Sequence, residues 1–527
     1  MRTFRIVFIT LCVVLSFNSV ALFAKAYEYP KEPLSCTSIM VGRKASADGS
    51  VITSHTCDGN YRTWMNIVPA GRFERDTITY IYKNRLHTES VHGSYTLSLK
   101  GSIPEAKATY RFLDTAYPCL NEKQLGIGET TISGRDTLIN PNGLFYIEEL
   151  EKIVLQRCST ARDAIKLIGE LVKEYGYCDG GECLTIADPD EVWHFEIFGE
   201  GPDKIGGVWA AVRIPDDHVG VSANISRIST LDLKDTLNYL ASDNVYDVAK
   251  RLGLWDGSSK FRFWEAYSGG NYFNEKKAFH IREYFILNEL APSLGLSYDS
   301  EELPLSVKPD SKVSVEKVML LLAQTYEGTE FDVIKNLKVD SVTAKAANPW
   351  MLRDTRNMLN ALKPGTVPNN RLVAVPQCSY STVIQLRNWL PDDLGGVAWV
   401  CLDNPGQSPR IPIFCGTLSL PECFSYCGQM REDEQSILWK FRKANKLSTV
   451  RWGDAKDDIL GAMKYFIEKG RVESRFVEER YLEILATEGS EAACDFLTGY
   501  TRDFAGAAIL RWEELENLFW KKFGRGF

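Results

Sequence analysis

Short runs of β-branched and apolar residues, broken by turn residues, recur along the first part of the chain. Residues 35–42 and 51–58 form two such runs, and Asp48-Gly49 lies in the polar break between them. An Asp-Gly pair suits the positive φ that tight hairpins need, so the pattern predicts a β-hairpin whose first strand opens at Cys36. Short alternating pieces between Arg62 and Tyr117 predict further strands.

Helical periodicity appears next. Apolar residues recur at spacings of three and four over 146–175, which predicts two amphipathic helices with Ser159-Thr160 as a cap between them. Residues 232–345 and 432–527 are also largely helical in pattern. A second group of strand-like runs lies at residues 183–188, 192–197, 209–214, 219–224 and, later, 379–387 and 397–400. Strands and helices segregated in this way predict an α+β fold.

The N-terminal segment has the features of a signal peptide over residues 1–26. Arg2 and Arg5 precede an apolar run too short to span a bilayer comfortably, and small residues surround Lys25. The polar, proline-containing residues 27–35 then predict a short propeptide. On this interpretation the protein is exported, to the periplasm or outside the cell, with no stable membrane insertion once the signal is removed.

Two other interpretations of this segment remain open. The apolar run could be a membrane anchor that the protein retains. A lipidated Cys36 fits less well, because a lipidated cysteine should follow its apolar run directly, and residues 27–33 intervene.

Cleavage before Cys36 would place the chain's free α-amine beside a thiol. A thiol with a pKa near ~8.5 is mostly protonated at neutral pH, whereas an α-amine that titrates around ~7.7 to 8.0 can accept its proton. Nucleophile and base would then belong to one residue, and no histidine is required for the proton transfer.

Several segments resemble the secreted cysteine dipeptidases of the N-terminal-nucleophile (Ntn) hydrolase superfamily, relatives of penicillin V acylase and bile salt hydrolase. The motifs that carry the resemblance are Cys36-Thr37, the turn over residues 42–50, Asp58, and residues 121–131, 221–227, 379–387, 390–391 and 395–400. The resemblance implies a four-layer αββα sandwich over 36–430, with a helical insertion at about 232–345 and a helical C-terminal extension over 431–527.

The resemblance also implies roles for individual residues. Cys36 is the expected nucleophile, and Asp58 is expected to orient its α-amine. Asn224, through its side chain, and a backbone N–H at Thr130 or Thr131 are the expected donors to the oxyanion. Each also has a plainer interpretation, Asn224 as the end of a strand and Thr130 as part of a buried strand.

His55 departs from the pattern, since many relatives have an arginine at this place. A histidine beside a thiol could hold a positive charge there, or it could serve a structural role. The sequence alone leaves both interpretations open.

Composition narrows the class of partner. The chain has a net charge of −8 and no basic cluster, which argues against nucleic acid as a partner. Of the 13 cysteines, an odd number remains once Cys12 in the signal and Cys36 are set aside. The pairs Cys178/Cys183 and Cys423/Cys427 are spaced for local disulfides, with structural zinc as the competing hypothesis. We expect neither a metal nor another cofactor in catalysis.

These observations favour a cysteine dipeptidase that hydrolyses small peptides through an acyl-enzyme. One alternative is an acylase that acts on a non-peptide amide, such as a bile-salt or penicillin side chain, by the same chemistry. The other is a non-catalytic surface protein that keeps the fold. A homo-oligomer is compatible with each of these hypotheses.

Overall fold

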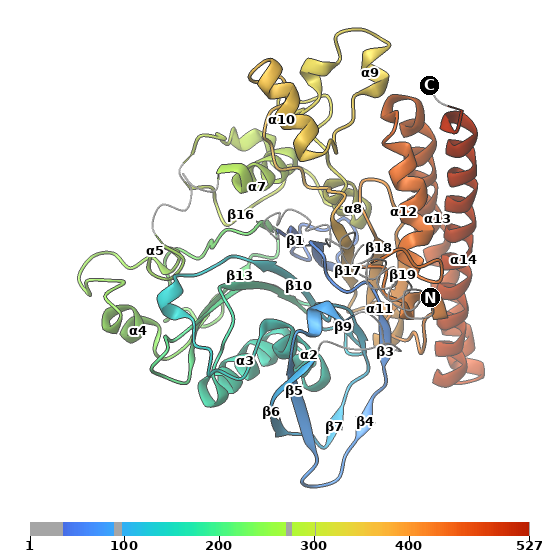
Figure 1. Ribbon diagram of the computed structural model, residues 1–527. Coiled ribbons are helices and arrows are strands. Elements are labelled where there is room, and N and C mark those ends of the chain that lie inside the picture. Colours follow the sequence, from blue (N-terminus) through green and yellow to red (C-terminus); the bar gives the residue numbers. More distant parts are fainter. Residues whose placement is uncertain (1–34, 89–96, 270–276, 301, 430, 526–527) are drawn as a thin grey trace, which may run out of the picture. The chain divides into compact units, whose positions relative to one another are not determined.

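The computed structural model describes residues 35–88, 97–269, 277–300, 302–429 and 431–525, which belong to one compact unit (Figure 1). The predicted signal peptide and all of the predicted propeptide except Ser35 lie outside the described residues. No helix in the described ranges is long and apolar enough to cross a membrane.

Two large antiparallel sheets form the centre of the unit. The seven-stranded sheet has the order β16 (Ser306–Val307), β14 (Val219–Ser222), β1 (Ser38–Val41), β2 (Val51–Asp58), β17 (Cys378–Leu386), β18 (Val397–Leu402) and β19 (Ile411–Phe414). The eight-stranded sheet has the order β15 (Tyr239–Ala241), β13 (Gly207–Ile214), β12 (Val192–Gly199), β11 (Glu182–Ala187), β10 (Gly126–Thr131), β9 (Leu120–Asn121), β8 (Phe112–Asp114) and β3 (Asn66–Val68).

Two small hairpin sheets accompany them. They are β4 (Gly71–Arg72) with β7 (Ala108–Thr109), and β5 (Ile78–Lys83) with β6 (Ser98–Pro104). The predicted strands between Arg62 and Tyr117 are therefore present, although only some of them join a large sheet.

The predicted first hairpin is confirmed. β1 and β2 pair antiparallel, with Val41 opposite Ile52, and Gly49 in the turn has a φ of 90°. Asp48 fixes the turn because its carboxylate accepts hydrogen bonds from Ser46 Oγ and from the N–H of Ser50.

The two sheets face each other through β2 of one and β10, β11 and β12 of the other. Thr53 Oγ1 and Thr185 Oγ1 hydrogen-bond across this interface at 2.6 Å. Almost every residue of these central strands is buried, so the core is continuous between the sheets.

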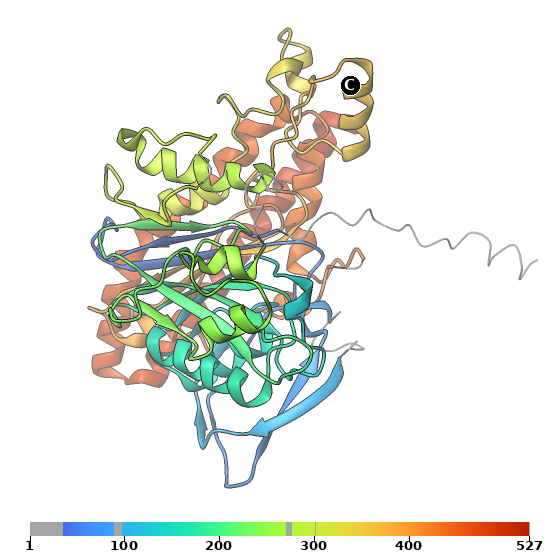
Figure 2. The same cartoon turned by 90° about the vertical axis from the view of Figure 1, so that its left-hand side faces the viewer.

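Helices pack on both sheets (Figures 1 and 2). The helices of the described residues are α2 (Ile147–Arg157), α3 (Ala161–Tyr175), α4 (Val245–Arg251), α5 (Phe263–Tyr267), α7 (Lys277–Leu290), α8 (Val315–Leu322), α9 (Thr343–Ala346), α10 (Arg353–Leu362), α11 (Asp392–Gly395), α12 (Ile437–Ser448), α13 (Trp452–Thr487) and α14 (Ser490–Phe523). Short 3₁₀ helices lie at Arg85–His87, Asp136–Leu138, Pro292–Leu294, Lys335–Leu337 and Glu422–Ser425.

α2 and α3 contact the eight-stranded sheet, and α7 and α8 contact the seven-stranded sheet. α2 and α3 match the two helices predicted over 146–175. Thr160 is the N-cap of α3, and its side chain accepts from the N–H of Asp163. The segment 232–345 is less helical than its pattern predicts. It also contributes β15 and β16, which pair with β13 and β14 as edge strands.

The C-terminal segment forms the three helices α12, α13 and α14, which lie side by side and contact β18 and β19 (Figure 1). Trp512 of α14 is fully buried against Phe441 and Phe466, and its indole N–H donates to Asn445 Oδ1 at 3.0 Å.

Neither predicted disulfide is present, since every cysteine in the described part of the chain is a free thiol. The side chains of each pair make different contacts. Cys183 Sγ accepts from Ser222 Oγ at 3.3 Å, whereas the Cys178 thiol donates to the carbonyl of Phe145. Cys427 lies near Thr63 and Gln429 rather than Cys423.

The packing of α14 leads to a stability prediction. Trp512→Ala should lower the free energy of unfolding by about 3–5 kcal/mol, because it leaves a cavity among aromatic rings. Trp520→Ala on the same helix removes a side chain that is 56% exposed and should change the urea midpoint little. Equal shifts in the two variants would contradict the packing described here.

Candidate active site

Cys36 lies two residues before β1, which is placed between β14 and β2 in the seven-stranded sheet. The residue is fully buried. Its backbone N–H donates to Asn224 Oδ1 at 2.8 Å, so the nitrogen that would become the mature α-amine is already held in place.

Asn224 follows β14 and has a φ of 64°. Asparagine tolerates this left-handed conformation better than most residues, and the turn aims its side chain back toward Cys36. Asn224 Nδ2 donates to the carbonyl of Thr131 at 2.7 Å. The side chain thus connects Cys36 to the end of β10 in the facing sheet.

Arg282 of α7 holds Cys36 and Asn224 together. It is fully buried, and its guanidinium donates to Cys36 O at 2.6 Å, Thr37 Oγ1 at 2.9 Å, Ala223 O at 2.8 Å and Asn224 Oδ1 at 2.8 Å. Burial lowers the pKa of Arg282 to about 9, so the group still carries its charge at neutral pH.

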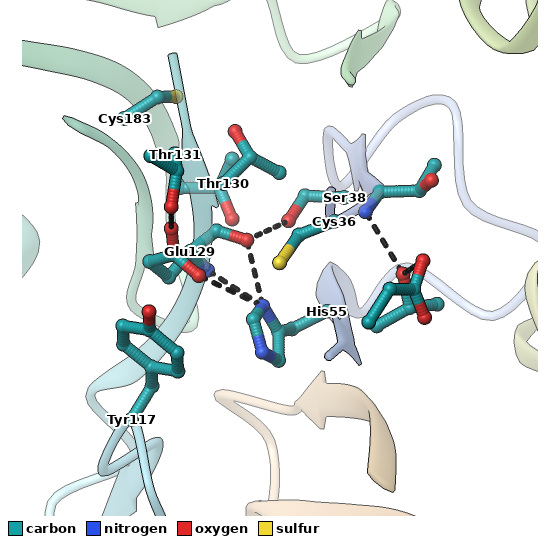
Figure 3. Close-up of polar contacts among 12 residues, drawn as sticks. Cys36, Ser38, His55, Tyr117, Glu129, Thr130, Thr131 and Cys183 are labelled. Atoms are coloured by element: carbon teal, nitrogen blue, oxygen red, sulfur yellow. Dashed lines mark hydrogen bonds and ion pairs between the residues drawn. The ribbon is translucent and has the colours of Figure 1, made fainter. Parts of the chain in front are cut away.

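The Cys36 thiol faces β10. Its sulfur, a ring nitrogen of His55 and a carboxylate oxygen of Glu129 all lie within 4.8 Å of one another (Figure 3). His55 Nδ1 is 2.6 Å from the carbonyl oxygen of Glu129 and 3.2 Å from its backbone nitrogen. Ser38 Oγ donates to the same carbonyl at 3.3 Å.

These three side chains have donor chemistry that a metal ion could use. Among the described residues, these are the three side chains whose ligand atoms lie close enough together to bind one metal ion. The Nδ1 atom of His55 is already in contact with the main chain of Glu129, however, so a metal ligand there would have to give up that contact.

Burial controls protonation at this site. It raises the pKa of the Cys36 thiol well above its ordinary value, and the negative charges of Glu129, Cys57 and Asp58 raise it further. Burial also raises the pKa of Glu129 to about 7. The pKa of His55 falls to about 4 because its charged form would be desolvated, so the imidazole is neutral and holds no positive charge beside the thiol.

Asp58 ends β2 on the other side of Cys36. Its Oδ2 accepts from Thr56 Oγ1 at 3.0 Å and from Arg371 at 2.9 Å. Arg371 also donates to Ser35, through Nε to the hydroxyl at 2.9 Å and through a terminal nitrogen to the carbonyl at 3.3 Å. The residue before Cys36 is therefore held by the same arginine that pairs with Asp58.

Thr130 follows Glu129 in β10, and its hydroxyl hydrogen-bonds Ser222 Oγ at 2.6 Å. Ser222 is the last residue of β14, just before the turn that carries Asn224. This hydrogen bond therefore connects β10, which carries Thr130, to the end of β14, which Asn224 follows.

All five residues predicted for the site, Cys36, His55, Asp58, Thr130 and Asn224, are buried in this region. Their chemical roles stay predictions.

Sequence reasoning missed Glu129, Arg282 and Arg371. Glu129 stood within a recognised motif but was not singled out. Arg282 left a usable signal, since it is a charged residue on the same stripe of α7 as the buried Ile286. Arg371 lies in a loop and left none.

The chain is similar to known peptidases over most of its length. Residues 35–464 match the model of peptidase family C69. A protein of Latilactobacillus sakei named probable dipeptidase is 26% identical over 493 residues, covering 89% of this chain and 92% of its own length. A probable dipeptidase of Salmonella dublin is 26% identical over 73% of this chain and 81% of its own length, and dipeptidase A of Lactobacillus helveticus is 22% identical over 82% and 85%.

The family match covers most of the chain and begins one residue before Cys36. The chain belongs to peptidase family C69, a family of cysteine dipeptidases, and it is a hydrolase of that type.

The environment of His55 leads to a pH prediction. The unfolded chain binds a proton at this residue near pH 6.5, whereas the folded chain does so only near pH 4, so the folded state loses stability as pH falls between these values. From pH 7.5 to pH 5.0, wild type should lose about 2 kcal/mol more unfolding free energy than His55→Asn does.

Urea unfolding at both pH values measures this difference. The matching change of half-buried His218 controls for the general loss of an imidazole. An equal pH dependence in wild type and His55→Asn would show that His55 is not buried as a neutral ring.

Proposed function

We propose that this protein is a dipeptidase in which Cys36, as the first residue of the mature chain, is both nucleophile and base. The observation that carries the proposal is the 2.8 Å hydrogen bond from Cys36 N to Asn224 Oδ1, in a buried site whose thiol faces Glu129. Cleavage of the bond between Ser35 and Cys36 would turn this nitrogen into a primary amine. The relatives named dipeptidase support dipeptides as the substrate class.

The amine has a necessary part in this mechanism. Because burial and neighbouring carboxylates raise the pKa of the thiol, the thiol does not ionise by itself at neutral pH. The α-amine accepts its proton, the thiolate attacks the substrate carbonyl, and the amine passes that proton to the departing nitrogen as the C–N bond breaks. Water then hydrolyses the thioester. Asp58 orients the amine through its carboxylate.

Asn224 and a backbone N–H at Thr130 are the proposed donors to the oxyanion. Asn224 Oδ1 accepts from Cys36 N, which places the amide group beside the nucleophile, and the proposed donor is Nδ2, which in this structure donates to Thr131 O. The bond between Thr130 and Ser222 supports a fixed separation of the two donors. Arg282 positions both Cys36 and Asn224.

We further propose that the fold is the four-layer αββα sandwich of the Ntn hydrolases. Support comes from two facing antiparallel sheets, with α2 and α3 against one and α7, α8 and the C-terminal helices against the other. Export, with removal of residues 1–26 as a signal and 27–35 as a propeptide, is a proposal that rests on the sequence alone.

The decisive test concerns the N-terminus of the active form. A chain that starts with Met followed by Cys36 should lose its Met to host aminopeptidase and hydrolyse dipeptides. A chain in which a block to cleavage keeps Ser35 should fold but be inactive, since an amide nitrogen cannot accept the thiol proton.

Cys36→Ala should be inactive in either form. N-terminal sequencing and dipeptide assays, run beside N-acyl amides that an acylase would prefer, give the readout. If the uncleaved chain cleaves dipeptides as fast as the processed one, the mechanism proposed here is wrong.

The oxyanion assignment has its own test. Asn224→Ala, in material whose first residue is verified as Cys36, should lower kcat by ~10² to 10³ with a smaller change in KM, because the donor acts mainly in the transition state. Asn84→Ala is a matched control, since Asn84 also has a positive φ, of 69°, and lies outside the site. A change confined to KM would remove Asn224 from this role.

A further inference from the structure

The free ammonium group of a dipeptide must lie close to the nucleophile. Bond lengths in the peptide place this nitrogen about 2.5 Å from the carbonyl carbon of the same residue. A productive attack brings the sulfur to about 3–3.5 Å from that carbon. The ammonium nitrogen therefore lies within about 6 Å of the Cys36 sulfur, and a group that recognises it must border this small volume.

Two carboxylates act on the Cys36 thiol, Glu129 and Asp58. Asp58 is already compensated, because it forms an ion pair with Arg371 and accepts a hydrogen bond from Thr56. Glu129 is not. Its Oε1 accepts from Thr131 Oγ1 at 3.1 Å, and its buried Oε2 has no hydrogen-bond partner among the described residues.

The surroundings of Glu129 add no fixed cation. Among the described residues, its one ion-pair neighbour is His55 at 3.8 Å, and that imidazole is neutral. The carboxylate of Glu182 in β11 lies against Glu129, and Glu182 Oε2 is also without a partner. Burial raises the pKa of both carboxyl groups, which share a proton, and a cation brought by the substrate would stabilise the ionised form of Glu129.

We propose that Glu129 binds the free α-ammonium group of the dipeptide and thereby selects peptides with an unblocked N-terminus. Figure 3 shows Glu129 on the facing strand beside Cys36 and His55, and a carboxylate oxygen of Glu129 lies within 4.8 Å of the Cys36 sulfur. Glu182 lies behind Glu129, and the two buried carboxyl groups share a proton, so that the pair offers one negative charge to the ammonium group. The inference rests on the proposed function, because it assigns a substrate contact within that same site.

The test is the ratio of kcat/KM for Ala-Ala to that for N-acetyl-Ala-Ala. Wild type should prefer the free dipeptide strongly. Glu129→Gln keeps the shape of the side chain and removes its charge, so it should reduce this ratio roughly 10- to 100-fold. The loss should come mainly from a higher KM for Ala-Ala, and Glu129→Asp should restore part of the ratio.

Glu148→Gln is the matched control. Glu148 is also a buried glutamate with an unpartnered carboxylate oxygen and a raised pKa, but it lies at the start of α2. This variant should keep the wild-type ratio. If Glu129→Gln does not fold, Glu129→Asp is measured in its place and should lower the ratio in part, because the shorter side chain withdraws the carboxylate from the ammonium group.

The outcomes separate the two proposals. If wild type cleaves neither peptide, or both at equal rates, the dipeptidase function itself fails. If wild type prefers Ala-Ala and Glu129→Gln keeps that preference, or slows both peptides equally, Glu129 does not recognise the ammonium group. An unchanged ratio in Glu129→Asp, where that variant stands in, overturns the inference in the same way.

Discussion

The geometry around Cys36 depends on one buried cation. The Arg282 guanidinium reaches the carbonyl of Cys36, the hydroxyl of Thr37, the carbonyl of Ala223 and the side chain of Asn224. The two terminal nitrogens of this buried charge donate to all four acceptors, which offsets part of the cost of burial and draws the acceptors to one point, whereas Arg282 Nε has no partner among the described residues. The start of β1 and the turn after β14 are thereby held in register, although they are 188 residues apart.

The thiol side of the site has the opposite balance of charge. Glu129 and Glu182 lie together without a lysine or arginine among the described residues that pairs with them, and burial raises the pKa of each. Buried charged groups that lower stability and have no counter-ion are typical of functional sites. The charged guanidinium of Arg282 therefore lies on the backbone side of Cys36, and the paired carboxyl groups of Glu129 and Glu182 lie on its thiol side.

The hairpin prediction was confirmed and the two disulfide predictions were wrong, although all three rested on residues close together in the sequence. The hairpin from β1 to β2 was predictable because its alternating residues and its Asp48-Gly49 turn act within a few positions of each other. The pairs Cys178/Cys183 and Cys423/Cys427 were equally local, yet no disulfide forms. Cys183 is on a strand whose side chains alternate between two faces, and its thiol meets Ser222 instead.

The sequence by itself determined the elements near the nucleophile: the hairpin, the two helices over 146–175, the helical C-terminal segment, and Cys36 with four of the residues that gather around it. These follow from turn chemistry, periodicity and motif. Tertiary structure alone decided that β2 pairs with β17 and that the segment 232–345 supplies Arg282 and one edge strand of each large sheet. It also decided that Glu129 faces the thiol without a counter-ion among the described residues. The physical reason is that sheet order, burial and the pairing of charges depend on contacts between residues far apart in the chain, which no local pattern encodes.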